Sequence, residues 1–418
     1  MFMVNYYKYV TGDENAEPNS VLFWANILTF YNVISLVTQS FVGPTVLTPT
    51  VRRLSLSPRF ALSITFMMME VFVVLMLPLI KVSQTVAIVF FVIAAILGGM
   101  GKSYLEATSY TLAASMPPKF MSTIMFGISI CGLLTSTMQC VIKVSMENTY
   151  ESQLTQSYIY FSLALLIMEV ALVMVLSLRY NSYAQEHVAE FRVLKQNGES
   201  VKPQPVADVP TEVKEPTDVE DQCEVDNNGE GGMTTAEQLV ATPIMPVVRI
   251  IRMMLISCFL GFFLTIFIFP SLVIPIDRVD DWFSTIASLI FNIGNSIGAF
   301  STSFETFRYS RRVVLYGIIV RFLLIIPFVL SIYKYIPGHV GPYIFSFILG
   351  LTHQVAVLSM VCGPITPGLN DGQKLTTGQL MGIALLVDFL AASMVAMIVV
   401  MFSLRLLIRL YKNKSTEY

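Results

Sequence analysis

The feature that most constrains this chain is a series of ten long apolar segments. A helix needs about 20 mostly apolar residues to cross about 30 Å of hydrocarbon. Segments of this kind run over roughly 21–46, 60–82, 86–115, 120–144, 157–179, 249–275, 282–306, 313–335, 340–362 and 378–404. In lipid only a helix or a closed barrel satisfies its own backbone, and the alternating strands of a barrel are absent from the sequence. We therefore predict an all-α membrane protein.

The charge content agrees with this class and excludes several others. Only 13% of the 418 residues are charged, against about 25% in a typical soluble protein, and 55% are hydrophobic. This composition excludes a disordered chain, a disulfide-stapled secreted domain and an ordinary cytosolic enzyme. The net charge of -2 argues against nucleic acid as a partner, so membrane lipid is the expected surrounding.

One polar segment, residues 181–247, interrupts the series after its fifth span. Thirteen of the 28 acidic residues lie between Glu186 and Glu237. Such a composition predicts a flexible, solvated linker, and a regulatory or partner-binding segment is the alternative. The linker divides the chain into an N-terminal transmembrane half, residues 1–180, and a C-terminal transmembrane half, residues 248–418, of about five spans each.

The lysines and arginines of the short loops predict the orientation, because cytoplasmic loops carry more of them. The side that also holds the linker has eight, namely Arg52, Arg53, Arg59, Lys119, Arg308, Arg311, Arg312 and Lys374. The other side has four, namely Lys81, Lys143, Arg278 and Lys334. We therefore expect the linker to be cytoplasmic and both ends of the ten-span chain to lie outside.

Ionisable side chains within the spans are the first candidates for function, because each costs at least about 2.5 kcal/mol to insert. Lys102 and Glu106 lie four residues apart in the third span, on one helical face, and we expect them to pair. Gly98, Gly99 and Gly101 precede them and would let another helix or a ligand approach. The pair is either a structural ion pair or a polar substrate contact or proton relay.

Amide side chains mark one face of the seventh span. Asn292, Asn295 and Ser296 share this face, and an amide matches the donors and acceptors of a purine or pyrimidine edge. Hydrogen bonding between helices is the alternative interpretation.

Other polar residues within the spans have two interpretations each. Arg321, in the eighth span, needs a partner, and Asp388 in the tenth span is the candidate. His353, beside Gln354, is suited to read a base or to bond to a neighbouring helix. Glu70 and Glu169 fit helix contacts, or groups near water, better than a ligand site.

Motifs of enzymes and of metal sites are missing from the sequence. It has no HExxH, no P-loop, no GxSxG and no carboxylate cluster with metal spacing. We therefore expect neither catalytic residues, nor a cofactor, nor a bound metal.

Four motifs, in order along the chain, resemble the equilibrative nucleoside transporter family. The first runs from Glu106 through a Met-Pro-Pro turn at 116–118 to a Gly-rich stretch over 124–136, where the family has a polar residue, usually Gln, before a Leu-Pro turn. The others are Phe291–Gly298 for the family's Phe-Asn-x-x-Asp-x-x-Gly-Arg, Arg321–Pro327 for its Arg-x-x-x-x-x-Pro, and 362–381 for its Phe-Gly-Pro…Pro…Gly-x-x-Met. The resemblance covers about 22–401, and Lys102 with Glu106 looks most like protozoan members, some of which are proton-coupled.

This resemblance implies a bundle of the major-facilitator type in a multi-pass membrane protein, expected in the plasma membrane. Its substrate would be a nucleoside or a nucleobase, with protons as a candidate partner. The implied substrate-binding residues are Lys102, Glu106, Asn292, Asn295, Arg321 and His353. Residues implied in helix packing or gating are Gly127, Gly132, Gly298 and Asp388.

The chain also departs from the family pattern in three respects. The family has six spans before its linker, whereas the segment 1–8 here resembles only the outer end of the family's first helix, so most of that helix is expected to be missing. The signature's Asp is Asn295 and its Arg is Ala299. Glu106 stands in place of the usual Gln.

The leading hypothesis is transport of nucleosides or purine nucleobases by alternating access. A degenerate, non-transporting membrane protein, or a receptor that signals through the linker, is the alternative from another class. An intramembrane enzyme has only scattered carboxylates in its favour.

Overall fold

A computed structural model provides the structure of the chain. It describes residues 5–415 except for 26, 146–148, 201–232, 270–271, 274–275, 278–279, 303 and 305–309. The acidic centre of the predicted linker, 201–232, therefore lies outside the described residues.

The described residues form helices in both predicted halves. Before the linker these are α1 (Tyr6–Thr11), α2 (Val21–Ala25), α3 (Ile27–Val42), η1 (Gly43–Leu47), α4 (Pro49–Arg52), α5 (Leu56–Ile80), α6 (Gln84–Ala114), α7 (Pro118–Ser145), α8 (Tyr150–Ser177) and η2 (Leu178–Tyr180). After them come α9 (Ser182–His187), α10 (Ala189–Ser200), α11 (Thr235–Ala241), α12 (Ile244–Ile268), α13 (Asp281–Ser301), α14 (Arg311–Arg321), η5 (Phe322–Leu324), α15 (Ile325–Ile332), α16 (Val340–Cys362) and α17 (Asp371–Ser415).

Nine helices within the described ranges are long and apolar enough to cross a membrane, with α8–η2 and α14–η5–α15 each counted as one. They correspond to nine of the ten predicted spans. The remaining span, 21–46, is built from the short α2, the 16-residue α3 and the 3₁₀ turn η1. The all-helical fold is thus confirmed.

Prolines explain where two of these helices begin or change their winding. Pro118 is the first residue of α7, where a missing N–H costs nothing. Pro327 lies near the start of α15 and cannot donate to the carbonyl one turn earlier. The chain adopts the tighter 3₁₀ winding of η5 just before it, so α14 and α15 continue as one membrane-spanning segment.

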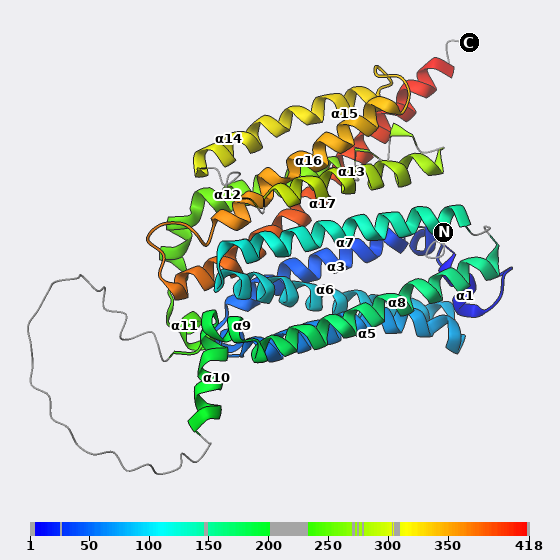
Figure 1. Ribbon diagram of the computed structural model, residues 1–418. Helices are drawn as coiled ribbons and strands as arrows, with labels where there is room; N and C mark the ends of the chain where they lie inside the picture. The colour runs from blue at the N-terminus through cyan, green and yellow to red at the C-terminus, as the bar shows by residue number, and fades with distance from the viewer. Residues whose placement is uncertain are drawn as a thin grey trace, which may run out of the picture.

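The helices form two packed groups, visible as a lower and an upper layer in Figure 1. The lower group contains α3 and α5 to α8, and the upper group contains α12 to α16. The upper group also includes α17, and the most extensive contacts between the groups are antiparallel: α7 lies along α13, and α6 lies along α17. The two halves therefore meet mainly along two helix pairs, with smaller contacts of α3 with α17 and of α7 with α16.

The core between the halves is rich in methionine. Met121 and Met125 of α7 pack with Met254 of α12, Met360 of α16 and Met381 of α17. By contrast, the most apolar part of α8 has no residue buried within the protein, so its side chains require lipid. Methionine is flexible and polarizable, which suits an interface whose packing must change.

The linker-side end of the bundle is held together by two buried charged residues. Arg52 of α4 is only 4% exposed. It donates to the carbonyl oxygens of Leu239 (2.7 Å) and Thr242 (3.1 Å) and to Thr376 Oγ1 of α17 (3.2 Å). Glu190 of α10 accepts from the backbone N–H of Leu56 at the start of α5 (2.8 Å). Both ends of the predicted linker are thus helical and attached to the bundle.

The environment of Glu190 changes its acidity. Burial raises the pKa of its carboxyl, in opposition to the hydrogen bond from Leu56 and the charge of Arg59, which lower it. The Glu190 carboxyl is therefore easier to protonate when α10 is docked than a carboxyl in water would be.

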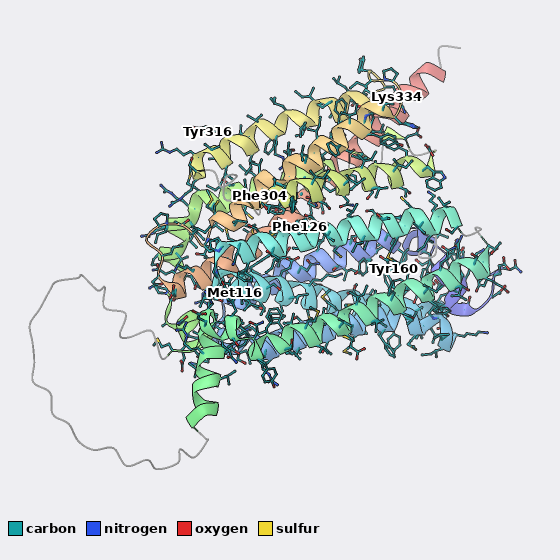
Figure 2. All side chains as sticks on the ribbon, viewed as in Figure 1. Met116, Phe126, Tyr160, Phe304, Tyr316 and Lys334 are labelled. Carbon is teal, nitrogen blue, oxygen red and sulfur yellow. The ribbon has the colours of Figure 1, made fainter. Side chains whose placement is uncertain are left out.

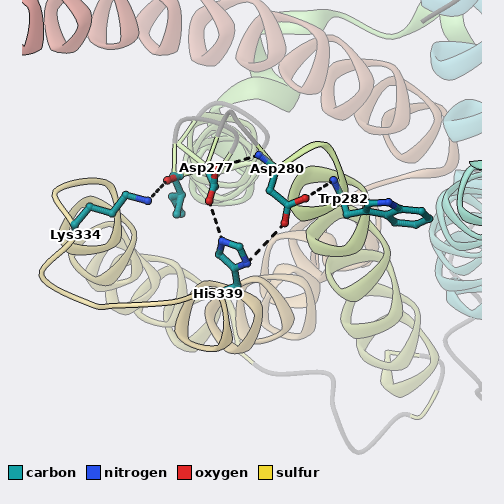
Figure 3. Close-up of polar contacts among 6 residues, drawn as sticks. Asp277, Asp280, Trp282, Lys334 and His339 are labelled. Carbon is teal, nitrogen blue, oxygen red and sulfur yellow. Dashed lines mark hydrogen bonds and ion pairs between the residues drawn. The ribbon is translucent and has the colours of Figure 1, made fainter. Parts of the chain in front are cut away.

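The opposite end of the bundle has its own polar contacts (Figure 3). His339 Nε2 lies 2.9 Å from Asp277 Oδ2, and its Nδ1 lies 3.8 Å from Asp280 Oδ2. Lys334 donates to the carbonyl of Ile276 (2.8 Å). Figure 2 shows the two ends, with Met116 at the linker side and Lys334 far from it. These contacts join the α12–α13 connection to the α15–α16 turn.

We predict that Arg52→Ala destabilises the bundle while Arg53→Ala does not. Arg52 is buried with three hydrogen bonds, whereas Arg53 is exposed. Because hydrogen bonds to a charged group contribute about 1.5–3 kcal/mol each, the loss should lower the melting temperature by several degrees. Thermal unfolding of the purified variants in detergent measures this, and equal melting temperatures would contradict it.

Candidate functional site

Lys102 forms its ion pair with Glu70 of α5, and not with Glu106 as the spacing predicted. Lys102 Nζ lies 3.4 Å from Glu70 Oε1 and donates to the hydroxyl of Tyr31 on α3 (2.7 Å). The Tyr31 hydroxyl in turn donates to Glu70. This triad joins three helices of the N-terminal half. The expected pairing within one helix is wrong because a carboxylate from a neighbouring helix reaches the ammonium.

The glycines of α6 explain why Glu70 reaches Lys102. A Cβ at Gly98 would collide with the Glu70 carboxylate, and one at Gly101 would lie 2.6 Å from the Ser63 carbonyl oxygen. At Gly99 a Cβ would lie 2.8 Å from the Ser35 carbonyl oxygen of α3. The prediction that these glycines admit other helices is confirmed, and the space beside Gly98 holds the carboxylate.

Arg321 is buried, at 4% exposure, and all its hydrogen-bond acceptors among the described residues are neutral. It donates to the carbonyl of Gly261 (3.2 Å), to Thr265 Oγ1 (3.0 Å) and to Thr352 Oγ1 (3.2 Å). The expected partner, Asp388, does not bond to it. Arg321 instead holds α12 and α16 together, since carbonyl and hydroxyl oxygens of these helices surround its guanidinium.

His353 lies beside this arginine and faces the interior. Its Nδ1 lies 3.0 Å from Thr265 Oγ1, and its ring meets that of Phe262 edge to face at a centroid distance of 4.9 Å. Thr265 therefore contacts both Arg321 and His353. These contacts fix the imidazole on α16, and its other ring nitrogen bonds to none of the described residues.

Glu106 and Asp388 lie between the halves, on α6 and α17. Asp388 is fully buried, and neither of its carboxyl oxygens has a hydrogen-bond partner among the described residues. Glu106 Oε2 is buried and is likewise without a described partner. Within the described residues, both acids thus have buried carboxyl oxygens that accept no hydrogen bond.

The amides of α13 serve contacts between helices. Asn292 donates to Ser136 Oγ on α7 (2.7 Å), and Ser296 donates to the Ser129 carbonyl on the same helix (3.1 Å). Asn295 points to α16 instead, where Gln354 donates to its Oδ1 (2.7 Å). Asn292 and Ser296 thus lie between the two halves, whereas Asn295 lies within the C-terminal half.

The predicted packing glycines differ in what surrounds them. A Cβ at Gly132 would lie 2.6 Å from Asn292 Oδ1, and one at Gly298 would lie 2.5 Å from Gln354 Cγ. Both glycines therefore permit close helix contact. Gly127 has open space where a Cβ would lie, so the prediction that it packs against a helix is wrong.

A cavity of about 630 Å³ opens between the halves at the linker side. Its walls include the 115–118 turn, the 364–369 turn before α17, and residues of α10 and α11 such as Arg192 and Gln238. None of the predicted substrate-binding residues lines it. Ala113, on its wall, is about two helical turns from Glu106. The cavity therefore lies at the linker-side end, apart from the predicted substrate-binding residues.

Sequence reasoning did not identify two of these groups as parts of a site. Tyr31 completes the Lys102–Glu70 triad, and Thr265 connects Arg321 with His353. Both are single hydroxyl residues in apolar runs, and their sequence spacing gives no signal of the partner helix.

We predict that Lys102→Ala is compensated by Glu70→Ala and not by Glu106→Ala. Removing the lysine alone leaves the Glu70 carboxylate buried and unpaired, which costs more than the net gain of the pair. Surface expression and thermal stability of the single and double variants measure this. Rescue by Glu106→Ala in place of Glu70→Ala would show that the ion pair described above is not the one that forms.

Gly132 and Gly127 offer a matched pair on α7. We predict that Gly132→Ala weakens the α7–α13 contact and lowers transport, because its methyl group meets Asn292 Oδ1. Gly127→Ala should be neutral or stabilising, by at most about 1 kcal/mol from helix propensity. Uptake normalised to surface protein distinguishes them, and equal losses in both variants would refute the packing difference.

Two solved structures share this arrangement of helices. The proton:xylose symporter XylE of the major facilitator superfamily has a TM-score of 0.55 and 12% identity over 94% of this chain and 83% of its own. The major facilitator FucP in its outward conformation has a TM-score of 0.50 and 13% identity over 94% and 87%. At such low identity the likeness shows the fold, which is that of the major facilitator superfamily.

Curated relatives cover most of the chain. Nucleoside transporter 1 of Crithidia fasciculata is 30% identical over 92% of this chain and 86% of its own length. Adenosine transporter 1 of the same organism is 31% identical over the same shares. Nucleoside transporter 1.2 of Leishmania donovani is 30% identical, again over the same shares.

A family profile described as "Nucleoside transporter" matches residues 92–401, which is well over half of the chain. The profile, the relatives and the nine apolar helices agree on a multi-pass membrane transporter rather than an enzyme. The chain belongs to the nucleoside transporter family.

Proposed function

We propose that this chain carries nucleosides and purine nucleobases across the membrane by alternating access, with the two halves rocking about a central site. Family membership over residues 92–401 is the observation that carries the proposal. The placement of Glu106, Asp388 and His353 supports it, because they bring polar groups of both halves to the interior of an otherwise apolar bundle.

In this proposal Glu106 and His353 contact the substrate directly. Glu106 belongs to the N-terminal half and has an unused carboxyl oxygen. His353 belongs to the C-terminal half and is held at Nδ1 by Thr265, which leaves Nε2 for a base or ribose. A purine edge carries both donors and acceptors, so one carboxyl and one imidazole suffice to orient it.

The other predicted site residues act on the site through helix contacts. Lys102 and Arg321 hold helices within the N- and C-terminal halves, respectively. Asn292 bonds across the α7–α13 contact, which must change when the halves rock. Asn295 is engaged by Gln354. We propose protons as a co-substrate, the plasma membrane as the location, and a cytoplasmic position for the linker and its helices α9 to α11.

Uptake by the purified chain in lipid vesicles tests the proposed substrates. We expect saturable uptake of radiolabelled adenosine, with competition by adenine and by inosine but not by free ribose. His353→Ala should raise KM by roughly two- to twelvefold, the equivalent of one hydrogen bond of about 0.5–1.5 kcal/mol. His339→Ala is the matched control, since this histidine lies in the polar cluster at the far end.

Two results would contradict this assignment. Purine binding without flux, in vesicles that contain correctly folded chain, would favour a non-transporting receptor of the same fold. Equal KM values for the His353 and His339 variants would remove His353 from the substrate site.

A further inference from the structure

Lys143 and Trp282 meet where α7 ends and α13 begins, at the end of the bundle opposite the linker (Figure 1). The Lys143 ammonium lies 4.8 Å from the centroid of the Trp282 ring. It also donates to Thr285 Oγ1, three residues further along α13 (3.4 Å). Lys143 belongs to the N-terminal half, and the other two residues belong to the C-terminal half. A charged side chain of one half is thus held by an aromatic ring and a hydroxyl group of the other.

Each partner is fixed to its own half. Lys143 lies in the last turn of α7. The backbone N–H of Trp282 donates to Oδ1 of Asp280, the residue that caps α13 (2.9 Å). Figure 3 shows the indole of Trp282 pointing away from the polar cluster beside it. The two side chains therefore move with different halves, and their contact breaks when the halves separate at this end.

The chemistry of the contact suits an interaction that must break and form again. Trp282 is 37% exposed, and Lys143 is half-buried. A cation–π contact in such a setting changes an equilibrium by about two- to fivefold. When the contact opens, the ammonium enters water and the ring leaves no ion behind. Breaking the buried Lys102–Glu70 pair would instead strand a charge, which is far more costly.

The contact lies at the outer edge of the surface where α7 meets α13. Two helical turns deeper, Ser136 of α7 accepts a hydrogen bond from Asn292 of α13 (2.7 Å). Ser136, Cys140 and Lys143 follow one another at intervals of four and three residues, so they share one face of α7. Separation of the halves at this end therefore exposes Lys143 and Cys140 before it reaches Ser136.

We infer that Lys143 and Trp282 form the gate of the transport path at the end opposite the linker. The ammonium rests on the indole ring while this end is closed and leaves it when the end opens. This inference rests on the proposed function and names residues that control access of the substrate to the central site. Both act by holding α7 against α13, and neither needs to touch the substrate. With the linker in the cytoplasm, as proposed above, this is the outer gate.

The native thiol of Cys140 provides a test in the full chain. The purified chain in lipid nanodiscs is treated with iodoacetamide, which is uncharged, and mass spectrometry measures the labelling of Cys140 separately from the other four cysteines. Trp282→Leu removes the ring, and Lys143→Gln removes the charge but keeps a donor for Thr285. In both variants Cys140 should be labelled about two- to fivefold faster than in the wild type, because the closed end has lost the contact.

Conservative replacements and a matched control separate the gate from general packing. Lys143→Arg keeps a cation and Trp282→Phe keeps a smaller ring, so both should be labelled more slowly than Trp282→Leu. The variant with both Lys143→Gln and Trp282→Leu should be labelled no faster than the faster single variant, since only one contact is lost. Lys334→Gln changes a lysine at the same end that bonds within the C-terminal half, to the Ile276 carbonyl, and should be labelled like the wild type.

Adenosine uptake gives a second readout. The apparent affinity of a carrier for an external substrate is reduced by the fraction of molecules that are closed to it. Trp282→Leu should therefore lower the KM for adenosine by up to about two- to fivefold, and Lys334→Gln should leave it unchanged. A residue that only stabilised the fold would change the amount of active chain and not the KM.

Two results would overturn the inference and leave the proposed function standing. One is equal labelling of Cys140 in the wild type, Trp282→Leu and Lys143→Gln. The other is an equal acceleration in Lys334→Gln, which would indicate general loosening of this end. If Trp282→Leu does not fold, Lys143→Gln decides the question from the other side of the contact. Absence of adenosine flux in the wild type would reject the proposed function, and the gate with it.

Discussion

The absence of water in the hydrocarbon layer is the constraint on which this structure depends. A polar group that lies there must be satisfied by the protein itself. The backbone meets this requirement by forming helices. The polar side chains meet it through contacts between helices, such as the Lys102–Glu70–Tyr31 triad and the cage of oxygens around Arg321. Each of these contacts fixes the relative position of two or more helices within one half.

Contacts between the halves are built differently from those within a half. Along α7–α13 they are single hydrogen bonds, Asn292 to Ser136 and Ser296 to the Ser129 carbonyl, beside a glycine. Along α6–α17 they are glycine-mediated backbone contacts next to a methionine-rich cluster. Neutral hydrogen bonds contribute about 1 kcal/mol each, so these bonds can open at modest cost. Charged donors also cross between the halves, because Arg52 donates to Thr376 of α17 and Lys143 donates to Thr285 of α13. The Lys102–Glu70 pair in one half and the bonds of Arg321 to neutral oxygens in the other hold the helices of each half together.

The sequence was sufficient to predict the all-helical membrane fold, nine of the ten spans and the family. Hydropathy averaged over about 20 residues predicts which segments span the membrane. Four motifs in order along the chain indicate the family. Partners across helices were predicted less well. Lys102 bonds to Glu70 rather than to Glu106, and Arg321 bonds to neutral oxygens rather than to Asp388. Gly127 has open space where a neighbouring helix was expected. The spacing of residues along one helix shows which of them share a face. Which other helix packs against that face depends on the three-dimensional arrangement, which the sequence of a single span does not determine.

The mismatch between acids and bases within the spans follows from the same packing. Arg321, surrounded by carbonyl and hydroxyl dipoles, needs no carboxylate, which leaves Asp388 without the counter-charge that the sequence suggested for it. Lys102 forms its ion pair with Glu70, so Glu106 has no ion-pair partner among the described residues. Two independent assignments of cations to other partners thus leave two acids, one on α6 and one on α17, with unpartnered buried oxygens. Because a fold gains no stability from unmatched buried carboxyls, these two acids lower the stability of the bundle rather than hold it together.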